Sequence, residues 1–144
     1  MVRRRSQVLG YAATALVSCI LAGCGGSNNP ATAKVSGVVT YKGAPVGDAV
    51  VTFMPTSGRP ASGQTDAAGK FTLSTFGNND GAVLGDHKIS ITPYLKDVPM
   101  PETVEAAAAL PKLPFPARYA NPDTSTLTAK VDSGANEKNF ELTD

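Results

Sequence analysis

Few residues of this chain have the types and spacing that catalysis requires. His87 is the only histidine among 144 residues. A histidine-based metal site needs two or three such ligands, and a catalytic triad needs a nucleophile and a carboxylate that converge on the ring. Asp86 precedes His87, but adjacent residues of a strand point to opposite faces. No Gly-x-Ser-x-Gly motif is present either. We therefore interpret His87 as a strand-edge histidine and predict no catalytic residue.

Hard oxygen donors gather in one segment, 77–86 (GNNDGAVLGD). Asn78, Asn79, Asp80 and Asp86 have the oxygen atoms that Ca²⁺ prefers in proteins. The segment lacks the acidic twelfth position of an EF-hand loop, and Asn, Asp and Gly are also the ordinary residues of a turn between strands. We favour the turn, so we expect no metal and no cofactor.

Cys24 has the strongest chemical signal in the chain. Three arginines (Arg3, Arg4 and Arg5) precede an uncharged run, 8–22, which is shorter than the roughly 20 residues of a membrane-spanning helix and is typical of a secretory signal peptide. The run ends in LAGC, 21–24, which resembles the lipobox of bacterial lipoproteins. The resemblance implies a diacylglycerol on the Cys24 sulfur, cleavage after Gly23, and acylation of the new amino group with palmitate or a similar chain.

The lipobox divides the chain into three parts. Residues 1–23 form the expected signal peptide, whose apolar run is predicted to be helical. Residues 24–33 form a flexible tether rich in Gly, Ser, Asn and Pro, and residues 34–144 form one domain. Because Cys19 is removed and Cys24 carries lipid, the mature chain has no free thiol and no disulfide.

The expected location is the cell envelope. Several acyl chains bind a membrane stably, since each buried methylene contributes about 0.8 kcal/mol. Gly25, rather than Asp, follows the lipidated cysteine, which indicates the outer membrane or the cell surface in bacteria that use an Asp retention signal. Without residues 1–23 the chain has ten basic and twelve acidic residues, a formal net charge of −2. A mildly acidic domain without a basic cluster indicates that nucleic acid is not a partner.

The hydrophobic pattern has a period of two from residue 34 onward. Alternation of apolar and polar residues marks strands with one buried and one wet face. It predicts seven strands, at 34–41, 48–55, 62–66, 70–76, 87–94, 126–131 and 138–143. The residues that it predicts to be buried are Phe53, Phe71, Leu73, Ile89, Ile91, Leu127, Val131 and Phe140, and those on the opposite faces are Thr72, Ser74, Lys88 and Ser90.

The segments between these strands also have characteristic sequences. Asp66 and Gly69 occupy the first and fourth positions of a predicted type I turn, which makes a hairpin of 63–66 and 70–75. Residues 93–122 form a Pro-rich insertion in which 101–110 is predicted to be helical, with Glu102 and Glu105 as first-turn charges. We interpret Tyr119 as a packing anchor. The apolar residues of the insertion either pack on the domain or meet a partner: Val98, Met100, Leu110, Leu113 and Phe115.

Residues 35–55 (VSGVVTYKGAPVGDAVVTFMP) followed by 62–73 (SGQTDAAGKFTL) resemble the carboxypeptidase regulatory-like domain, a transthyretin-like sandwich. Residues 117–134 resemble the closing segment of small lipoproteins with this domain in planctomycete-type bacteria. The resemblance implies an all-β fold, a seven-strand transthyretin-like or Ig-like β-sandwich. It also implies an accessory module without chemistry of its own.

Two functions follow as hypotheses. The first is a membrane-anchored envelope lipoprotein that is not an enzyme and acts as a binding or structural module, with an envelope protein or a glycan as its partner. The alternative is a small hydrolase or an accessory subunit of an envelope enzyme. The scarcity of acids, bases and nucleophiles that could converge favours the first.

Overall fold

The computed structural model describes residues 28–95 and 114–144. Cys24 and the predicted helices at 8–22 and 101–110 lie outside these residues. Within them the chain is all-β, with eleven strands and one 3₁₀ helix. The elements are β1 (Thr32–Ala33), β2 (Val35–Tyr41), β3 (Ala44–Pro45), β4 (Ala49–Pro55), β5 (Ala61–Gln64), β6 (Lys70–Thr72), β7 (Ala82–Val83), β8 (Gly85–Pro93), η1 (Ala117–Ala120), β9 (Thr128–Val131), β10 (Asn136–Glu137) and β11 (Phe140–Leu142).

Strand β2 organises a five-stranded sheet because it is paired along both edges. On one edge it pairs antiparallel with β6 and β3, and on the other it pairs parallel with β10 and β11. Between β10 and β11, the carbonyl oxygen of Lys138 lies 1.8 Å from the point where a Cβ atom on Gly37 would be. Glycine is therefore required at position 37 for the last segment of the chain to lie against β2.

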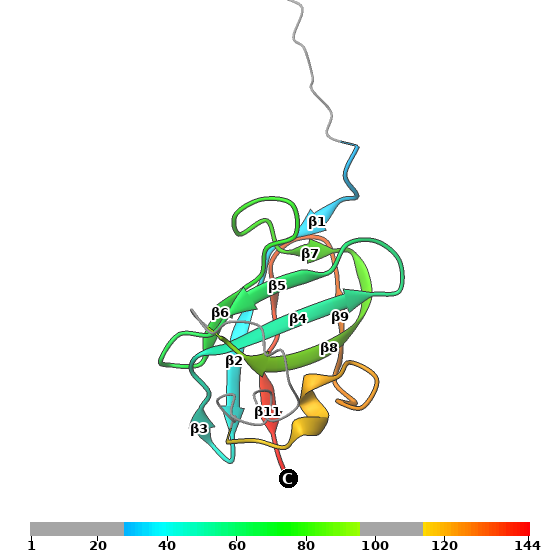
Figure 1. Ribbon diagram of the computed structural model, residues 1–144. Helices are drawn as coiled ribbons and strands as arrows, with labels where there is room; N and C mark the ends of the chain where they lie inside the picture. Colours follow the sequence, from blue (N-terminus) through cyan, green and yellow to red (C-terminus); the bar gives the residue numbers. More distant parts are fainter. Residues whose placement is uncertain (1–27, 96–113) are drawn as a thin grey trace, which may run out of the picture.

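A second sheet has four antiparallel strands in the order β5-β4-β8-β9, and β1 pairs with β7 in a small two-stranded sheet. β1 lies at one end of the molecule, whereas β3, η1 and the end of β11 lie at the opposite end (Figure 1). We call that opposite end the far end. None of the sheets closes on itself, and the fold is like a β-sandwich.

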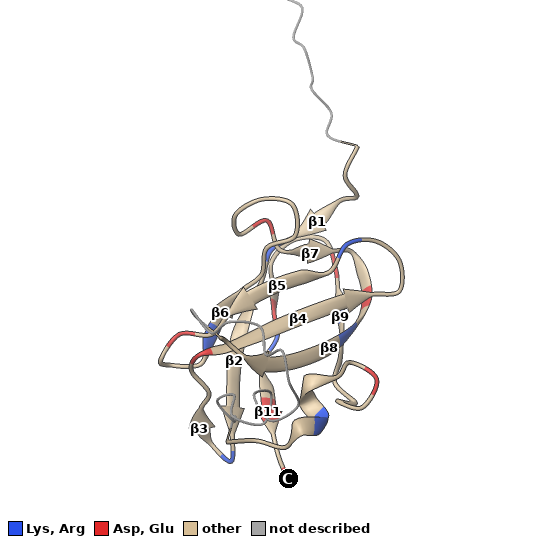
Figure 2. Ribbon diagram, in the orientation of Figure 1, with Lys and Arg blue, Asp and Glu red and all other residues tan. Residues whose placement is uncertain are grey.

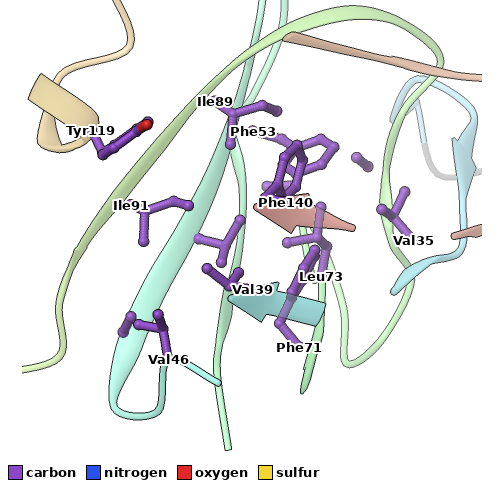
Figure 3. Packing of buried hydrophobic residues seen from close by; sticks show 14 of the residues in the cluster. Val35, Val39, Val46, Phe53, Phe71, Leu73, Ile89, Ile91, Tyr119 and Phe140 are labelled. Carbon is purple, nitrogen blue, oxygen red and sulfur yellow. The ribbon is translucent and has the colours of Figure 1, made fainter. Parts of the chain in front are cut away.

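The inward rows of the two larger sheets form one hydrophobic core (Figure 3). Phe53 is fully buried at its centre, with its ring 6.4 Å from that of Phe71, 5.9 Å from that of Phe140 and 5.7 Å from that of His87. Burial of a side chain of this size typically contributes about 1.5–3 kcal/mol, and well-placed aromatic pairs contribute more.

Each of the seven segments predicted to be strands contains or overlaps one observed strand. Four additional strands have only two residues each, so the strand count of seven is not confirmed. Seven of the eight residues predicted to be buried are buried. Leu127 was predicted to be buried but is only partly so. Ser90 was predicted to lie on the wet face, but it is 6% exposed because η1 packs on β8.

The predicted turn at Asp66 is confirmed. The carboxylate of Asp66 accepts hydrogen bonds from the N–H groups of Ala68 and Lys70, both at 2.9 Å, and Gly69 has a φ of +74°. The two arms of this hairpin nevertheless join different sheets, since β5 pairs with β4 and β6 pairs with β2. The hairpin therefore links the two larger sheets.

In the residues that the structure describes, no helix has the length and apolar character needed to cross a membrane.

Candidate binding surface

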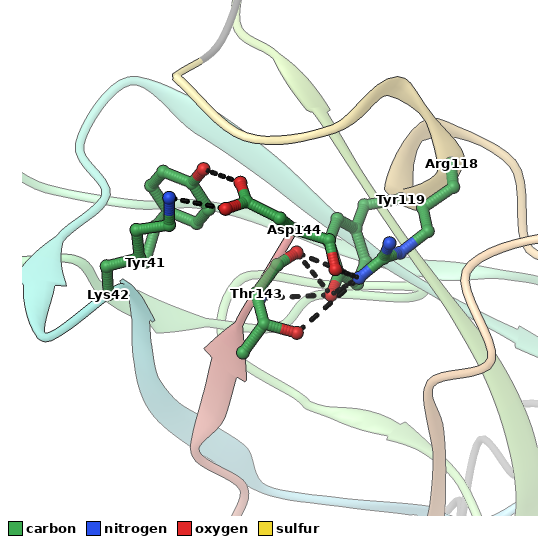
Figure 4. A network of polar contacts seen from close by, with 6 residues as sticks. All are labelled: Tyr41, Lys42, Arg118, Tyr119, Thr143 and Asp144. Carbon is green, nitrogen blue, oxygen red and sulfur yellow. Dashed lines mark hydrogen bonds and ion pairs between the residues drawn. The ribbon is translucent and has the colours of Figure 1, made fainter.

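The far end of the molecule contains a polar network that we call the clasp: Tyr41, Lys42, Arg118, Tyr119, Thr143 and Asp144 (Figure 4). These residues come from the end of β2, from η1 and from the segment after β11. Three parts of the chain that are distant in sequence therefore meet at one surface.

Tyr119 is the buried anchor of the clasp. Its side chain is 4% exposed, and its ring packs edge-on against Phe115 at 6.0 Å. Its hydroxyl accepts a hydrogen bond from the N–H of Thr143 and donates one to the carbonyl of Thr143, both at 3.1 Å. The interpretation of Tyr119 as a packing anchor is thus confirmed.

Arg118 binds the segment after β11 from the solvent side. Its Nη2 atom donates to the Tyr119 hydroxyl and to the carbonyl oxygens of Thr143 and Asp144, each at 2.8 Å. The guanidinium also lies 4.7 Å from the centre of the Tyr119 ring, a cation–π geometry. Burial raises the pKa of Tyr119, but hydrogen bonds from Thr143 and Arg118 lower it more, so the phenol pKa lies below its ordinary value.

The other half of the clasp is an exposed ion pair. Lys42 Nζ lies 2.5 Å from Asp144 Oδ2, and the Tyr41 hydroxyl donates to Asp144 Oδ1. The hydrogen bond from Lys42, followed by that from Tyr41, lowers the pKa of the Asp144 carboxyl, and the same bond to Asp144 raises the pKa of Lys42. Exposed pairs of this kind contribute little to stability, so this half mainly orients the side chains.

A shallow groove of 290 Å³ lies beside η1, on the outer face of the four-stranded sheet. Its lining residues are Met54, Pro55, Thr56, Lys88, Pro122 and Asp123. Lys88 Nζ lies 2.6 Å from Asp123 Oδ1 across it, and Met54 is 39% exposed. The volume is near the lower limit for small-molecule sites.

The segment considered for calcium is a turn whose main acid is bonded to the backbone. The Asp80 carboxylate accepts hydrogen bonds from the N–H groups of Thr75 at 2.7 Å and of Phe76 and Gly77 at 2.9 Å. Burial raises the pKa of Asp80, but these bonds lower it more, so the net shift is downward. No group of three acidic, histidine or cysteine side chains suited to a metal occurs in residues 28–95 and 114–144.

The interpretation of His87 as a strand-edge residue is wrong. β8 lies between β4 and β9, and His87 is 2% exposed because it belongs to the inward row of β8. Its Nε2 atom lies 2.7 Å from the carbonyl oxygen of Val83, while its buried Nδ1 atom has no hydrogen-bond partner among the described residues. Asp86 is exposed on the opposite face, as predicted.

Of the clasp residues, the sequence predicted a role only for Tyr119, as a packing anchor. Thr143 was predicted only as the last residue of the strand 138–143, and the contacts of Lys42, Arg118 and Asp144 were not predicted. The contact between position 41–42 and Asp144 depends on the parallel pairing of β2 with β11, for which the local sequence has no signal. Cys24, the predicted lipidation site, lies outside the described residues.

No family model matches the chain, and no curated protein matches it. Among solved structures, the chain is similar to a DUF3823 family protein from Parabacteroides merdae, with 16% sequence identity and a TM-score of 0.44. The similar region covers 80% of this chain and 47% of that one, so the chain spans about half the length of that structure. A similarity at this level assigns no family, and the carboxypeptidase regulatory-like resemblance stays a prediction.

Proposed function

We propose that this chain is a lipid-anchored protein of the cell envelope whose β domain is a non-catalytic binding or structural module. The observation that carries the proposal is the sequence 21–24, LAGC, after an uncharged run and an arginine cluster. The anchor would be the lipidated Cys24, and the location would be the outer membrane or the cell surface.

The placement of the chain ends supports this role. The last two residues of the predicted tether, Thr32 and Ala33, form β1 at one end of the domain, and the clasp lies at the opposite end (Figure 1). A domain tethered in this way presents the clasp and the neighbouring groove away from the membrane. Basic and acidic residues are spread over loops and strand ends of both sheets (Figure 2), which supports a protein or glycan partner rather than nucleic acid.

We further propose that the domain is a transthyretin-like sandwich of the carboxypeptidase regulatory-like type. The residues that carry the resemblance have structural reasons to be there. Gly37 lies against Lys138, Gly69 has the positive φ of the turn, and Phe71 is in the core. Seven main strands would form the sandwich, with the Pro-rich insertion between β8 and β9.

Binding rather than catalysis is supported by the state of the polar groups. The Tyr119 hydroxyl and the Asp80 carboxylate, which have shifted pKa values, are hydrogen-bonded to the chain's own backbone. The hydrolase alternative would rely on His87, but that ring is buried and one nitrogen is already bonded to Val83. A general base must reach the substrate proton.

Intact mass spectrometry of the protein purified from membranes tests the anchor. We expect a chain that begins at Cys24 and carries both a diacylglycerol and an N-acyl group. The Cys24→Ser variant should lose the lipid mass, while its domain stays folded by circular dichroism. An unmodified Cys24, or a mature chain that begins elsewhere, would contradict the proposal.

A further inference from the structure

The two edges of the four-stranded sheet differ in their hydrogen bonding. β5 forms one edge, and its outward backbone groups are paired with the β6 arm: Ser62 exchanges two hydrogen bonds with Ser74, at 3.0 and 2.9 Å, and the N–H of Asp66 donates to the carbonyl of Lys70 at 2.9 Å. This edge is therefore closed by the chain itself.

The other edge, β9, has no neighbouring strand on its outer side among the residues that the structure describes. In an antiparallel ladder, residues alternate between those bonded to the neighbouring strand and those that point away from it. The N–H of Ile89 donates to the carbonyl of Leu127, so Ala129 and Val131 are the residues of β9 that bond to β8. The backbone groups of Thr128 and Lys130 point outward, and no hydrogen bond to them is found among residues 28–95 and 114–144.

The inner face of β9 is incompletely covered. Leu127 and Ala129 pack against the core but remain partly exposed, whereas Val131 is 1% exposed. An additional strand along β9 would place its own inward side chains beside Leu127 and Ala129.

The edge is also weakly defended against pairing. Proteins commonly protect such edges with lysine, proline or bulges. Lys130 is the only charged residue of β9, and its Nζ atom lies 3.8 Å from Asp132 Oδ1 on the same chain. Lys130 is therefore the only charged side chain of β9 that an incoming strand meets, and β9 contains no proline.

We propose that β9 is a docking edge for an extended segment of another polypeptide, which adds a strand to the sheet through the backbone of Thr128 and Lys130. The four outward groups, two N–H and two C=O, specify the backbone of a β-strand as the ligand. Because the inner row of β9 is only half covered, the incoming strand should alternate, with an apolar side chain beside Ala129 and polar side chains on the wet face. This inference rests on the proposed binding role and identifies the partner's chemistry.

A synthetic hexapeptide of alternating threonine and valine is the probe. Amide hydrogen exchange of the full chain, measured by NMR while the peptide is added, should show slower exchange at Thr128 and Lys130. Peptides methylated on the nitrogens of alternate residues lack the donors of one edge. The peptide methylated on its pairing edge should give no protection, which tests the proposal without altering the protein.

Two variants at position 130 form a matched pair. Lys130→Thr removes the charge but keeps the outward N–H, and should bind the peptide as the wild type does. Lys130→Pro removes the charge and the N–H, and should weaken binding by about tenfold or more, the effect of losing one backbone hydrogen bond and admitting the proline ring. Edge strands tolerate proline where the N–H faces outward, so both variants should melt at similar temperatures.

The proposal is wrong if the unmethylated peptide gives no protection of these amides at millimolar concentration, or if Lys130→Pro and the methylated peptides bind equally well. Protection of Thr128 and Lys130 that rises with protein concentration alone would assign the edge to a second copy and overturn the proposed occupant. Neither result affects the mass of Cys24, so failure of this inference is distinguishable from failure of the proposed anchor.

Discussion

Replacing Tyr119 with phenylalanine tests whether the clasp holds the far end together. The variant keeps the ring in its place against Phe115 and removes one oxygen atom. That oxygen makes three hydrogen bonds, two with the backbone of Thr143 and one with Arg118. The change therefore separates the hydrogen bonds of the clasp from its packing.

The expected loss follows from the exposure of the partners. A net hydrogen bond contributes about 1 kcal/mol, and a buried group left without a partner costs more. Thr143 and Arg118 are exposed and regain water, and Arg118 keeps its bonds to the carbonyls of Thr143 and Asp144. Each of the two hydrogen bonds with Thr143 therefore contributes about 1 kcal/mol, so the free energy of unfolding should fall by about 2 kcal/mol in all. For a domain of this size, this lowers Tm by about 8 °C.

Urea unfolding monitored by circular dichroism, with thermal melts in parallel, measures this loss. The midpoint should fall without a change in the slope m, because the unfolded surface is unchanged. Tyr94→Phe is the matched control, since Tyr94 is 39% exposed, and its effect should stay within about 0.5 kcal/mol. If Tyr119→Phe is as stable as this control, the clasp contributes orientation only and the reasoning is refuted.

Three further predictions concern other parts of the domain. Gly37→Ala should destabilise the domain by about 3 kcal/mol or prevent folding, because the new methyl group meets the Lys138 carbonyl. Gly77 has open space around it, so Gly77→Ala should be nearly neutral when both variants are unfolded in urea. Asp80→Asn should lower the free energy of unfolding by about 1–2 kcal/mol, because the amide NH₂ group of asparagine would face backbone N–H groups that need an acceptor. Urea unfolding of the variant and of the wild type measures this difference. The pKa of Asp80 is lowered from 3.8, so the stability that its carboxylate contributes is fully present above pH 3.8 and is lost as the pH falls through the lowered pKa. Acid titration of the wild-type protein should show this loss of stability, and Asp80→Asn should show less of it.

The strands of this fold could be predicted because their signal is local. In 87–94 the inward row of Ile89 and Ile91 includes His87 by parity, so its burial could also have been predicted from the pattern. Ser90 was predicted to be exposed but is buried, because η1, from the Pro-rich insertion, packs on β8. This contact joins parts of the chain more than 25 residues apart, so the alternation of residues within β8 cannot predict it.

The sheet partners could not be predicted in the same way. The turn at Asp66–Gly69 indicates a hairpin, but which sheet each arm joins depends on long-range pairing of β5 with β4 and β6 with β2. The parallel pairing of β2 with β11 joins residues about 100 positions apart and creates the site where Lys42 meets Asp144. The clasp therefore depends on topology, and only its aromatic anchor, Tyr119, was predictable from the sequence.

The parallel pairing of β2 and β11 also determines how the domain responds to mechanical load. The tether enters next to the start of β2, and β11 ends beside the end of β2 at the far end (Figure 1). Tension between the tether and the far end pulls these two strands in opposite directions along their length. Their hydrogen bonds are then loaded together in shear rather than opened one after another. The domain thus resists pulling along the axis that links its N-terminal segment to the far end.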